Sequence, residues 1–303
     1  MDGKTVKAHL ALAGAGVMWG LMSPIGKLAM NAGVSSFSLT FMRMSGAAVC
    51  FWIASLFAPK EKISRRDFVM LFFAGLLGIV FNQGLFIFGL SLTSPVDATI
   101  ITTSLPIITL ILAALFLKEP ATPLKIIGVL MGTAGALILI LSTHSGSGVS
   151  GNIRGDLLCL TAQISFACYL TIFKGLISRY HIFTLMKWMF TYAAICFFPF
   201  SFRAMSDMMS GSFPVNVWLE IVYVVLFGTF FAYVLILIGQ KALRPTIVSM
   251  YNYLQPVVGT IVSVLLGIGG FGWIKAFASG LIFAGVYMVT QSKSKADLEK
   301  TIK

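Results

Sequence analysis

The sequence reads Thr102-Thr103-Ser104-Leu105-Pro106 in its first half and Asn252-Tyr253-Leu254-Gln255-Pro256 in its second half, so that Pro106 and Pro256 are 150 residues apart. Each stretch places polar residues and a proline inside a long apolar segment. Membrane helices that are broken at corresponding places in two halves of a chain are typical of transporters built from inverted repeats, in which the breaks mark the substrate site. The two stretches therefore predict a fold and the position of a binding site.

The composition indicates a membrane protein. The chain has 303 residues, of which 58% are hydrophobic and only 11% are charged, and its mean hydropathy is +0.94. A soluble domain carries about 25% charged residues. Apolar segments of roughly 20 residues are long enough to cross a bilayer as helices, and these segments lack the alternating pattern of a membrane β-barrel. We therefore expect an all-α integral membrane protein.

Ten membrane-spanning helices are expected from the apolar segments. A stretch over residues 144–153 that is rich in Gly and Ser separates the first five helices, in residues 1–143, from the last five, in residues 154–303. The approximate limits of the spans are 8–30, 35–58, 67–90, 94–117, 123–143, 154–177, 183–202, 217–240, 244–266 and 272–291.

The two halves share glycines and prolines at a constant spacing of 150 residues. The matching pairs are Gly78 and Gly228, Gly89 and Gly239, Pro95 and Pro245, Pro106 and Pro256, and Gly135 and Gly285. Earlier in each half the spacing is shorter, and Arg43 pairs with Lys187. Five spans per half is an odd number, so the second half must be inverted relative to the first. The sequence thus predicts two inverted five-helix repeats.

The basic residues predict the orientation. Most of the 22 Lys and Arg residues fall in the termini and in the connections on the same side as the termini. The opposite side carries Lys27, Arg154, Arg203 and Lys275. We expect the protein in the inner (plasma) membrane. The positive-inside rule then places both termini in the cytoplasm. The net charge of +12 reflects this orientation, and we expect no nucleic-acid partner.

Several motifs carry a family resemblance. The first helix contains Trp19-Gly20 and, a few residues later, Ser23-Pro24; the fourth span ends in Lys118-Glu119-Pro120, and the sixth opens with Gly155-Asp156-Leu157-Leu158. Over almost the whole chain these features resemble the EamA-type branch of the drug/metabolite transporter (DMT) superfamily. The resemblance implies an inner-membrane carrier, often an exporter of amino acids or related metabolites, that works by alternating access. In the second half Gly269 occupies the position of Glu119.

The fourth and ninth spans supply the first candidate binding residues. In each span the polar residues and the proline recur at spacings of three and four, which places them on one helical face. Proline removes a backbone hydrogen bond and frees a carbonyl group, although Ser and Thr in membrane helices also bond to their own backbone or to neighbours. The substrate-binding candidates are Thr99, Thr102, Thr103, Ser249, Asn252 and Tyr253, with Pro106 and Pro256 as gating helix breaks.

Other polar residues inside the spans are further candidates. Trp19 and Ser23 lie beside Pro24, where we expect a third helix break, and the tryptophan offers a surface for an apolar or aromatic solute. Buried amides and phenols in lipid either line a cavity or bond to a neighbouring helix. These substrate-binding candidates are Asn82, Gln83, Gln163, Tyr169 and Tyr233.

Arg43 and Lys187 are basic residues within spans. An ionisable residue inside the membrane indicates a functional site, and Arg43 is a candidate ligand for a substrate carboxylate or phosphate. The alternative is a structural role, in which the long side chain extends to the lipid headgroups.

Enzyme, metal and cofactor chemistry are not expected. The four cysteines, Cys50, Cys159, Cys168 and Cys196, lie in apolar segments without paired spacing, and the three histidines lie far apart near span ends. The stretch Ser94-Pro95-Val96-Asp97 has the pattern of a helix cap, and we expect Glu119 to meet a basic loop residue.

The sequence predicts a secondary transporter, most simply an exporter of small organic metabolites such as amino acids. The partners we expect are a small-molecule substrate and the bilayer, with the protein as a monomer or homodimer. No acidic residue is expected in the middle of the membrane, which favours facilitated diffusion over proton antiport. The alternatives are an organic-phosphate or nucleotide-sugar antiporter that uses Arg43 and Lys187, and a membrane scaffold that transports nothing.

Overall fold

The computed structural model describes residues 3–92, 101–143, 153–265 and 272–292, without some side chains in these ranges, among them those of Ser23, Pro24 and Lys27. Within these ranges the chain is helical and forms no strand. The elements are α1 (Gly3–Asn31), α2 (Ser36–Ser55), α3 (Arg65–Gly75), η1 (Leu76–Phe81), α4 (Asn82–Leu92), α6 (Leu105–Leu117), α7 (Pro123–Thr143), α8 (Ile153–Ile172), α9 (Lys174–Arg179), α10 (Ile182–Ser210), α11 (Val215–Val225), η2 (Leu226–Phe231), α12 (Ala232–Ala242), α13 (Pro245–Met250), η3 (Tyr251–Tyr253), α14 (Leu254–Leu265) and α15 (Trp273–Gln291).

Six helical segments of the described part are long and apolar enough to cross a membrane. They are Ser36–Ser55, Arg65–Gly89, Ile153–Ile172, Ile182–Ser210, Val215–Ala242 and Trp273–Gln291, and the shorter helices Leu105–Leu117 and Pro123–Ile138 are also apolar. Many large hydrophobic side chains on these helices are exposed on the outside of the bundle, for example Leu115 and Phe200. Contiguous apolar surface of this extent is what a bilayer covers.

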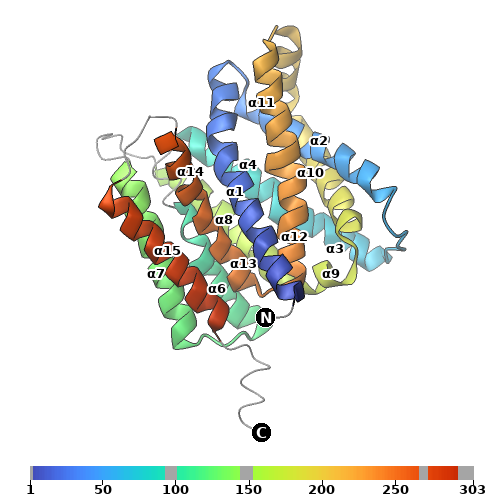
Figure 1. Ribbon diagram of the computed structural model, residues 1–303. Coiled ribbons are helices and arrows are strands. Elements are labelled where there is room, and N and C mark those ends of the chain that lie inside the picture. The colour runs from blue at the N-terminus through green and yellow to red at the C-terminus, as the bar shows by residue number, and fades with distance from the viewer. Residues whose placement is uncertain (1–2, 93–100, 144–152, 266–271, 293–303) are drawn as a thin grey trace.

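The first helix of each half packs against helices of the other half (Figure 1). Helix α2 packs on α10, and α7 packs on α15. Helix α1 lies against α11, α12 and α14 of the second half, whereas α8 lies against η1, α4 and α6 of the first. The main apolar core therefore joins residues from both halves, among them Phe51, Phe190 and Tyr233.

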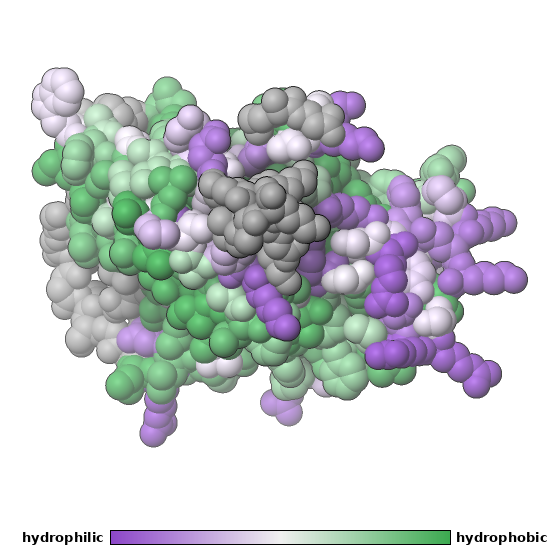
Figure 2. Space-filling view, turned by 90° about the horizontal axis from the view of Figure 1, so that it is seen from below, coloured by the Kyte–Doolittle hydropathy of each residue, from purple (hydrophilic) through white to green (hydrophobic). Residues whose placement is uncertain are grey.

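The start of α1 and the end of α15 lie at the same end of the bundle, which we call the terminal end (Figure 1). Seen from this end, hydrophilic residues gather mainly on one side, and hydrophobic residues cover much of the remaining surface (Figure 2).

Glycines allow the α7–α15 pair to pack closely. A Cβ atom added to Gly128 would lie 2.8 Å from the carbonyl oxygen of Gly285, and one added to Gly135 would lie 2.7 Å from the carbonyl oxygen of Ala278. Small residues at membrane-helix contacts let two backbones approach in this way. Gly128 and Ala278 are 150 positions apart, as are Gly135 and Gly285, so corresponding positions of the two halves exchange contacts.

The same spacing appears in the backbone. The π-helices η1 and η2 begin at Leu76 and Leu226, which are 150 positions apart. A break also recurs: residues 103–104 form a turn before α6, and η3 is a 3₁₀ turn before α14. Pro106 and Pro256 fall in the first turn of the helix that follows each break, where a proline costs no backbone hydrogen bond.

Three expected boundaries differ from the structure. Helix α1 runs through Pro24 without the expected break, because proline is tolerated inside membrane helices when their neighbours accommodate it. Helix α10 extends to Ser210 rather than ending near residue 202, since residues 203–210 mix polar residues with Ala and Met and contain no glycine or proline before Gly211. The expected span 154–177 is divided into α8 and the short α9.

Candidate functional site

A polar contact between the two halves lies at the centre of the bundle. The side-chain amide of Gln83 in α4 donates a hydrogen bond from Nε2 to the hydroxyl of Tyr233 in α12, at 2.8 Å. Both residues are more than nine-tenths buried. They are 150 positions apart, so equivalent positions of the two halves meet here. We call Arg43, Gln83, Thr229 and Tyr233 the central cluster.

Arg43 brings a charge to the central cluster. Its Nε donates to the hydroxyl oxygen of Thr229 at 3.0 Å, and Thr229 precedes Tyr233 by four residues. Thr229 is fully buried in η2. The ion pairs in the described part of the chain are Lys125–Glu119 and Arg179–Asp67, so within that part Arg43 has no carboxylate partner.

The π-helical segments contribute backbone groups to the centre. A π-turn is wider than an α-turn and is frequent at functional sites. The indole nitrogen of Trp19 donates to the carbonyl oxygen of Gly228 in η2 at 3.1 Å, and the hydroxyl of Ser165 donates to that of Leu77 in η1 at 2.9 Å. In both cases the first helix of one half is held to the π-segment of the other half.

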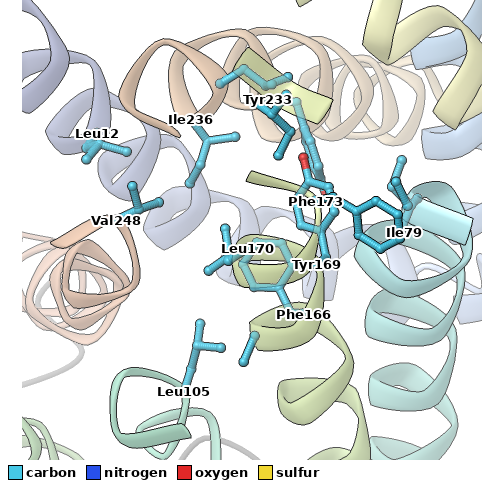
Figure 3. Close-up of a cluster of buried hydrophobic side chains, with 14 of the residues drawn as sticks. Leu12, Ile79, Leu105, Phe166, Tyr169, Leu170, Phe173, Tyr233, Ile236 and Val248 are labelled. Carbon is cyan, nitrogen blue, oxygen red and sulfur yellow. The ribbon is translucent and has the colours of Figure 1, made fainter. Parts of the chain in front are cut away.

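Aromatic rings surround the Tyr233 phenol. The Trp19 and Phe190 rings lie edge-on to it, with centroids 5.9 Å and 5.0 Å away. Tyr169 of α8 lies in the same buried cluster, together with Phe166 and Phe173 (Figure 3). The centre therefore combines one cation and several hydrogen-bonding groups with surrounding aromatic side chains.

Two buried amides at the centre keep unused hydrogen-bonding atoms. The Gln83 Oε1 has no partner among the described residues, and neither has the Gln240 Nε2, although Gln240 Oε1 accepts from Tyr169 at 3.1 Å. An unsatisfied buried polar atom costs about 1–3 kcal/mol. Such atoms are uncommon in folded proteins, and here they leave hydrogen-bonding capacity at the centre.

A second polar group lies where the two helix breaks meet. The Tyr253 hydroxyl donates to the carbonyl oxygen of Thr103 at 3.1 Å and lies 2.6 Å from the hydroxyl of Thr133. Asn252 donates to Ser249 O at 3.2 Å and accepts from Gln255 at 2.8 Å. These bonds join η3 to the turn before α6 and occupy the Asn252 amide within its own break.

The other predicted site residues are dispersed. Asn82 donates to Ala162 O at 3.2 Å, and the Ser249 hydroxyl donates to Thr246 O within its own helix. Gln163 is buried on α8, and Thr102 ends a helical turn before the first break. Thr99 and the side chains of Ser23 and Pro24 lie outside what the structure describes. The capping stretch 94–97 also lies outside it.

Lys187 does not join Arg43. Its Nζ lies 4.6 Å from the centre of the Trp52 ring, and it lines a surface pocket of about 270 Å³ together with Glu61 and Trp188. Trp52 follows Arg43 by nine residues on α2, which is about 13 Å along a helix. The two basic residues that match in sequence are therefore in separate environments.

Several central residues carry no sequence signal of their own. Thr229, Gln240 and Phe190 reach the centre only through the packing of η2, α12 and α10. Their one indirect signal is position, because Thr229 follows the repeated Gly228 and Gln240 follows the repeated Gly239. Glu119 meets a basic residue as expected, but this residue is Lys125 in the first turn of α7, at 3.0 Å, rather than a loop residue.

Metal-binding chemistry has no support in the described residues. No group of three His, Cys, Asp or Glu side chains in that part of the chain is placed to hold a metal ion. All four cysteines are free thiols. The fold thus defines a multi-pass helical membrane protein with a polar centre between its two halves.

Comparison with known proteins gives the family. The sequence model of the EamA-like transporter family matches residues 6–141 and 153–291. The chain belongs to the EamA-like transporter family. Similar proteins include an uncharacterized transporter of Archaeoglobus fulgidus (25% identity, 95% of this chain and 100% of that protein) and the uncharacterized transporter YyaM of Bacillus subtilis (25%, 87% of each). A WAT1-related protein of Arabidopsis thaliana is 22% identical over 92% of this chain and 82% of its own.

A solved structure has the same fold. It aligns with a TM-score of 0.76 at 20% identity and covers 93% of this chain and 96% of its own. At this level of identity the likeness concerns the arrangement of helices alone.

Proposed function

We propose that this protein is a secondary transporter that exports small organic metabolites such as amino acids across the inner membrane by alternating access. The observation that carries the proposal is the central cluster, where Arg43 and Gln83 of the first half bond to Thr229 and Tyr233 of the second half and keep unused hydrogen-bonding groups inside an apolar helical bundle. Charged groups inside a membrane protein are costly and are retained for substrate or ion pathways. The family membership agrees with this assignment.

Two inverted repeats of five helices, in residues 1–143 and 154–303, are part of the proposal. The π-helices η1 and η2 and the helix breaks at Pro106 and Pro256 recur at the 150-residue spacing. Alternating access moves one group of helices against the other around a fixed site. The breaks supply the flexible points, and the Tyr253–Thr103 bond couples them.

Contacts between the halves close the terminal end. Asp67 accepts from the hydroxyl of Tyr180 at 2.7 Å and lies 3.1 Å from Arg179, and Glu119 accepts from Thr246 at 3.1 Å. The positive-inside rule places this end in the cytoplasm. The structure then corresponds to a state closed toward the cytoplasm, and these contacts must break for a solute to enter from that side.

The phosphate-antiporter alternative requires two cations at one site. Arg43 stands alone in the central cluster, and Lys187 lies over Trp52 instead. A phosphate ester with two negative charges would remain half-neutralised in a low-dielectric site. The geometry therefore favours a solute with a single anionic group.

Proton coupling is a second candidate, favoured by Glu220. This residue lies in the apolar span Val215–Ala242, and its Oε2 is buried without a partner among the described residues. Sequence reasoning singled out no acidic residue within the spans. Export driven by an imposed pH gradient in wild type, but not in Glu220→Gln, supports coupling, whereas equal export by both supports facilitated diffusion.

Reconstitution tests the proposed function. Purified protein in proteoliposomes is assayed with radiolabelled aliphatic, aromatic and hydroxyl amino acids and with sugar phosphates, with and without unlabelled solute preloaded. Saturable amino-acid flux is expected. Flux of a phosphorylated solute alone, and only by exchange, would favour the antiporter, and an absence of flux for every compound would favour the scaffold.

A further inference from the structure

The four terminal N–H groups of Arg43 are available to a ligand. Its Nε is held by Thr229, but Nη1 and Nη2 donate to no residue in the described part of the chain. Thr40 and Ala47, which precede and follow Arg43 by one helical turn, are buried, so this side of α2 faces the interior. Arg43 itself is only half-buried. Part of its side chain is therefore accessible, and its two terminal nitrogens are unbonded within the described part of the chain.

A carboxylate fits this guanidinium better than other groups. The two terminal nitrogens form a planar fork that matches a carboxylate with two parallel hydrogen bonds. A cationic solute would be repelled. A dianionic solute would need a second basic residue, and Lys187 is engaged with Trp52 instead.

Gln83 adds a second requirement for the ligand, which is a hydrogen-bond donor. Its side chain is 7% exposed, its Nε2 donates to Tyr233, and its Oε1 lacks a partner among the described residues. Thr229, which holds Arg43, and Tyr233, which holds Gln83, are four residues apart in the chain, so Arg43 and Gln83 bond to neighbouring positions of the second half. A ligand that satisfies both carries a hydrogen-bond donor close to its carboxylate.

We propose that Arg43 binds a single carboxylate of the transported solute while Gln83 Oε1 accepts from an N–H or O–H donor beside it, so that the site takes 2-amino and 2-hydroxy monocarboxylic acids. The apolar part of the solute lies against the Trp19 and Phe190 rings, which flank Tyr233. This inference rests on the proposed function and narrows its substrate class.

The test compares matched ligands on wild-type protein. Reconstituted protein is assayed by counterflow, and detergent-solubilised protein by thermal shift, with L-leucine, L-phenylalanine and their 2-hydroxy acid analogues. Their methyl esters, the corresponding decarboxylated amines and glucose 6-phosphate form the comparison series. Since a charge-assisted pair contributes about 1.5–3 kcal/mol, the acids are expected to bind about tenfold to a hundredfold more tightly than the esters or amines.

Variants of the protein show which residues cause the preference for acids. Arg43→Gln is expected to remove the preference for acid over ester, whereas Lys187→Gln, the matched loss of the other basic residue within a span, is expected to keep it. Gln83→Leu is expected to weaken acids with a 2-amino or 2-hydroxy group about tenfold relative to acids without one, such as 4-methylpentanoate. The ligand comparison on wild type stands even where a variant fails to fold.

The outcomes separate the inference from the proposed function. Solutes that are transported without any preference for a carboxylate, or a preference that survives in Arg43→Gln, would overturn the inference and leave the transporter assignment standing. A protein that moves no acid, ester, amine or phosphate ester would overturn both.

Discussion

At the terminal end Glu119 lies 3.0 Å from Lys125 and 3.1 Å from Thr246, whereas at the centre Arg43 has no acidic partner among the described residues. Asp67 and Glu61 at the terminal end likewise accept hydrogen bonds, from Tyr180 and from the backbone N–H of His181. At the centre one atom of Gln83 and one of Gln240 lack partners in the described part. Paired polar groups hold a closed contact together, and unpaired ones leave hydrogen-bonding capacity for a ligand.

Local backbone geometry places Glu119 for its role. Helix α6 ends at Lys118, which adopts a left-handed conformation with φ of 52°, and the N–H of Glu119 bonds back to Ala113 O at 3.2 Å. A left-handed residue at this place is a common way to end a helix, although the left-handed position normally favours glycine. The turn directs Glu119 to Lys125 in the first turn of α7.

The largest expected effect comes from breaking this ion pair. Glu119→Gln leaves the fully buried Lys125 without its counter-charge, and removal of one partner from a buried pair costs about 3–5 kcal/mol. Thermal or denaturant unfolding in detergent measures the loss. The double variant Glu119→Gln, Lys125→Met is expected to recover much of it, and a single variant as stable as wild type would show that the pair does not hold the terminal end.

A smaller effect is expected at the helix breaks. Tyr253→Phe removes the hydroxyl that bonds to Thr103 O and contacts Thr133, at a cost of about 1–3 kcal/mol, and uncouples the two breaks, so that transport slows. Tyr251→Phe is the matched control, because its hydroxyl contacts only His9, at 2.7 Å, and is half-buried. Unfolding and initial transport rates are measured for both, and equal effects would argue against a special role for Tyr253.

A nearly unchanged stability is expected at the centre. Gln83→Met removes an unsatisfied Oε1 and also the bond from Nε2 to Tyr233; the two effects oppose each other, so stability is expected to stay within about 1 kcal/mol of wild type, while transport is lost. A loss of stability comparable with that of Glu119→Gln would mean that Gln83 serves packing rather than ligand binding. The pair of variants therefore compares the two regions in a single unfolding and transport assay.

A pH dependence of stability is also expected at the terminal end. Burial lowers the pKa of Lys174 from its ordinary value of 10.5 to about 8, against the opposing effect of Glu119. Between about 8 and 10.5 the unfolded chain binds more protons than the folded one, so stability rises with pH over that window. Thermal unfolding from pH 7 to pH 10 is expected to show this slope in wild type and to lose it in Lys174→Met; an unchanged slope in the variant would assign it elsewhere.

The sequence predicts the helical membrane fold and the helix breaks better than it predicts the contacts at the centre. The helical membrane class follows from composition, and the breaks before Pro106 and Pro256 follow from polar residues next to proline. Trp19, Arg43, Gln83 and Tyr233 were all candidates because a polar or charged residue inside a span stands out. The π-helices leave no local mark, since Gly78 and Gly228 are equally compatible with ordinary helix packing.

Arg43 and Lys187 show why sequence equivalence does not give equivalent roles. They match in the two halves, yet Arg43 meets Thr229 and Lys187 meets Trp52. The partner of each is decided by which helix packs against it, and that information lies in the tertiary contacts. Pro24 makes the same point, because its helix continues through a residue that breaks helices elsewhere in the chain.

An experimental structure of the protein with a transported solute bound tests the central claim most directly. The account predicts density for the solute in the central cluster, with its carboxylate on the terminal nitrogens of Arg43 and a donor on Gln83 Oε1. A solute bound elsewhere, with Arg43 still held only by Thr229, would contradict it.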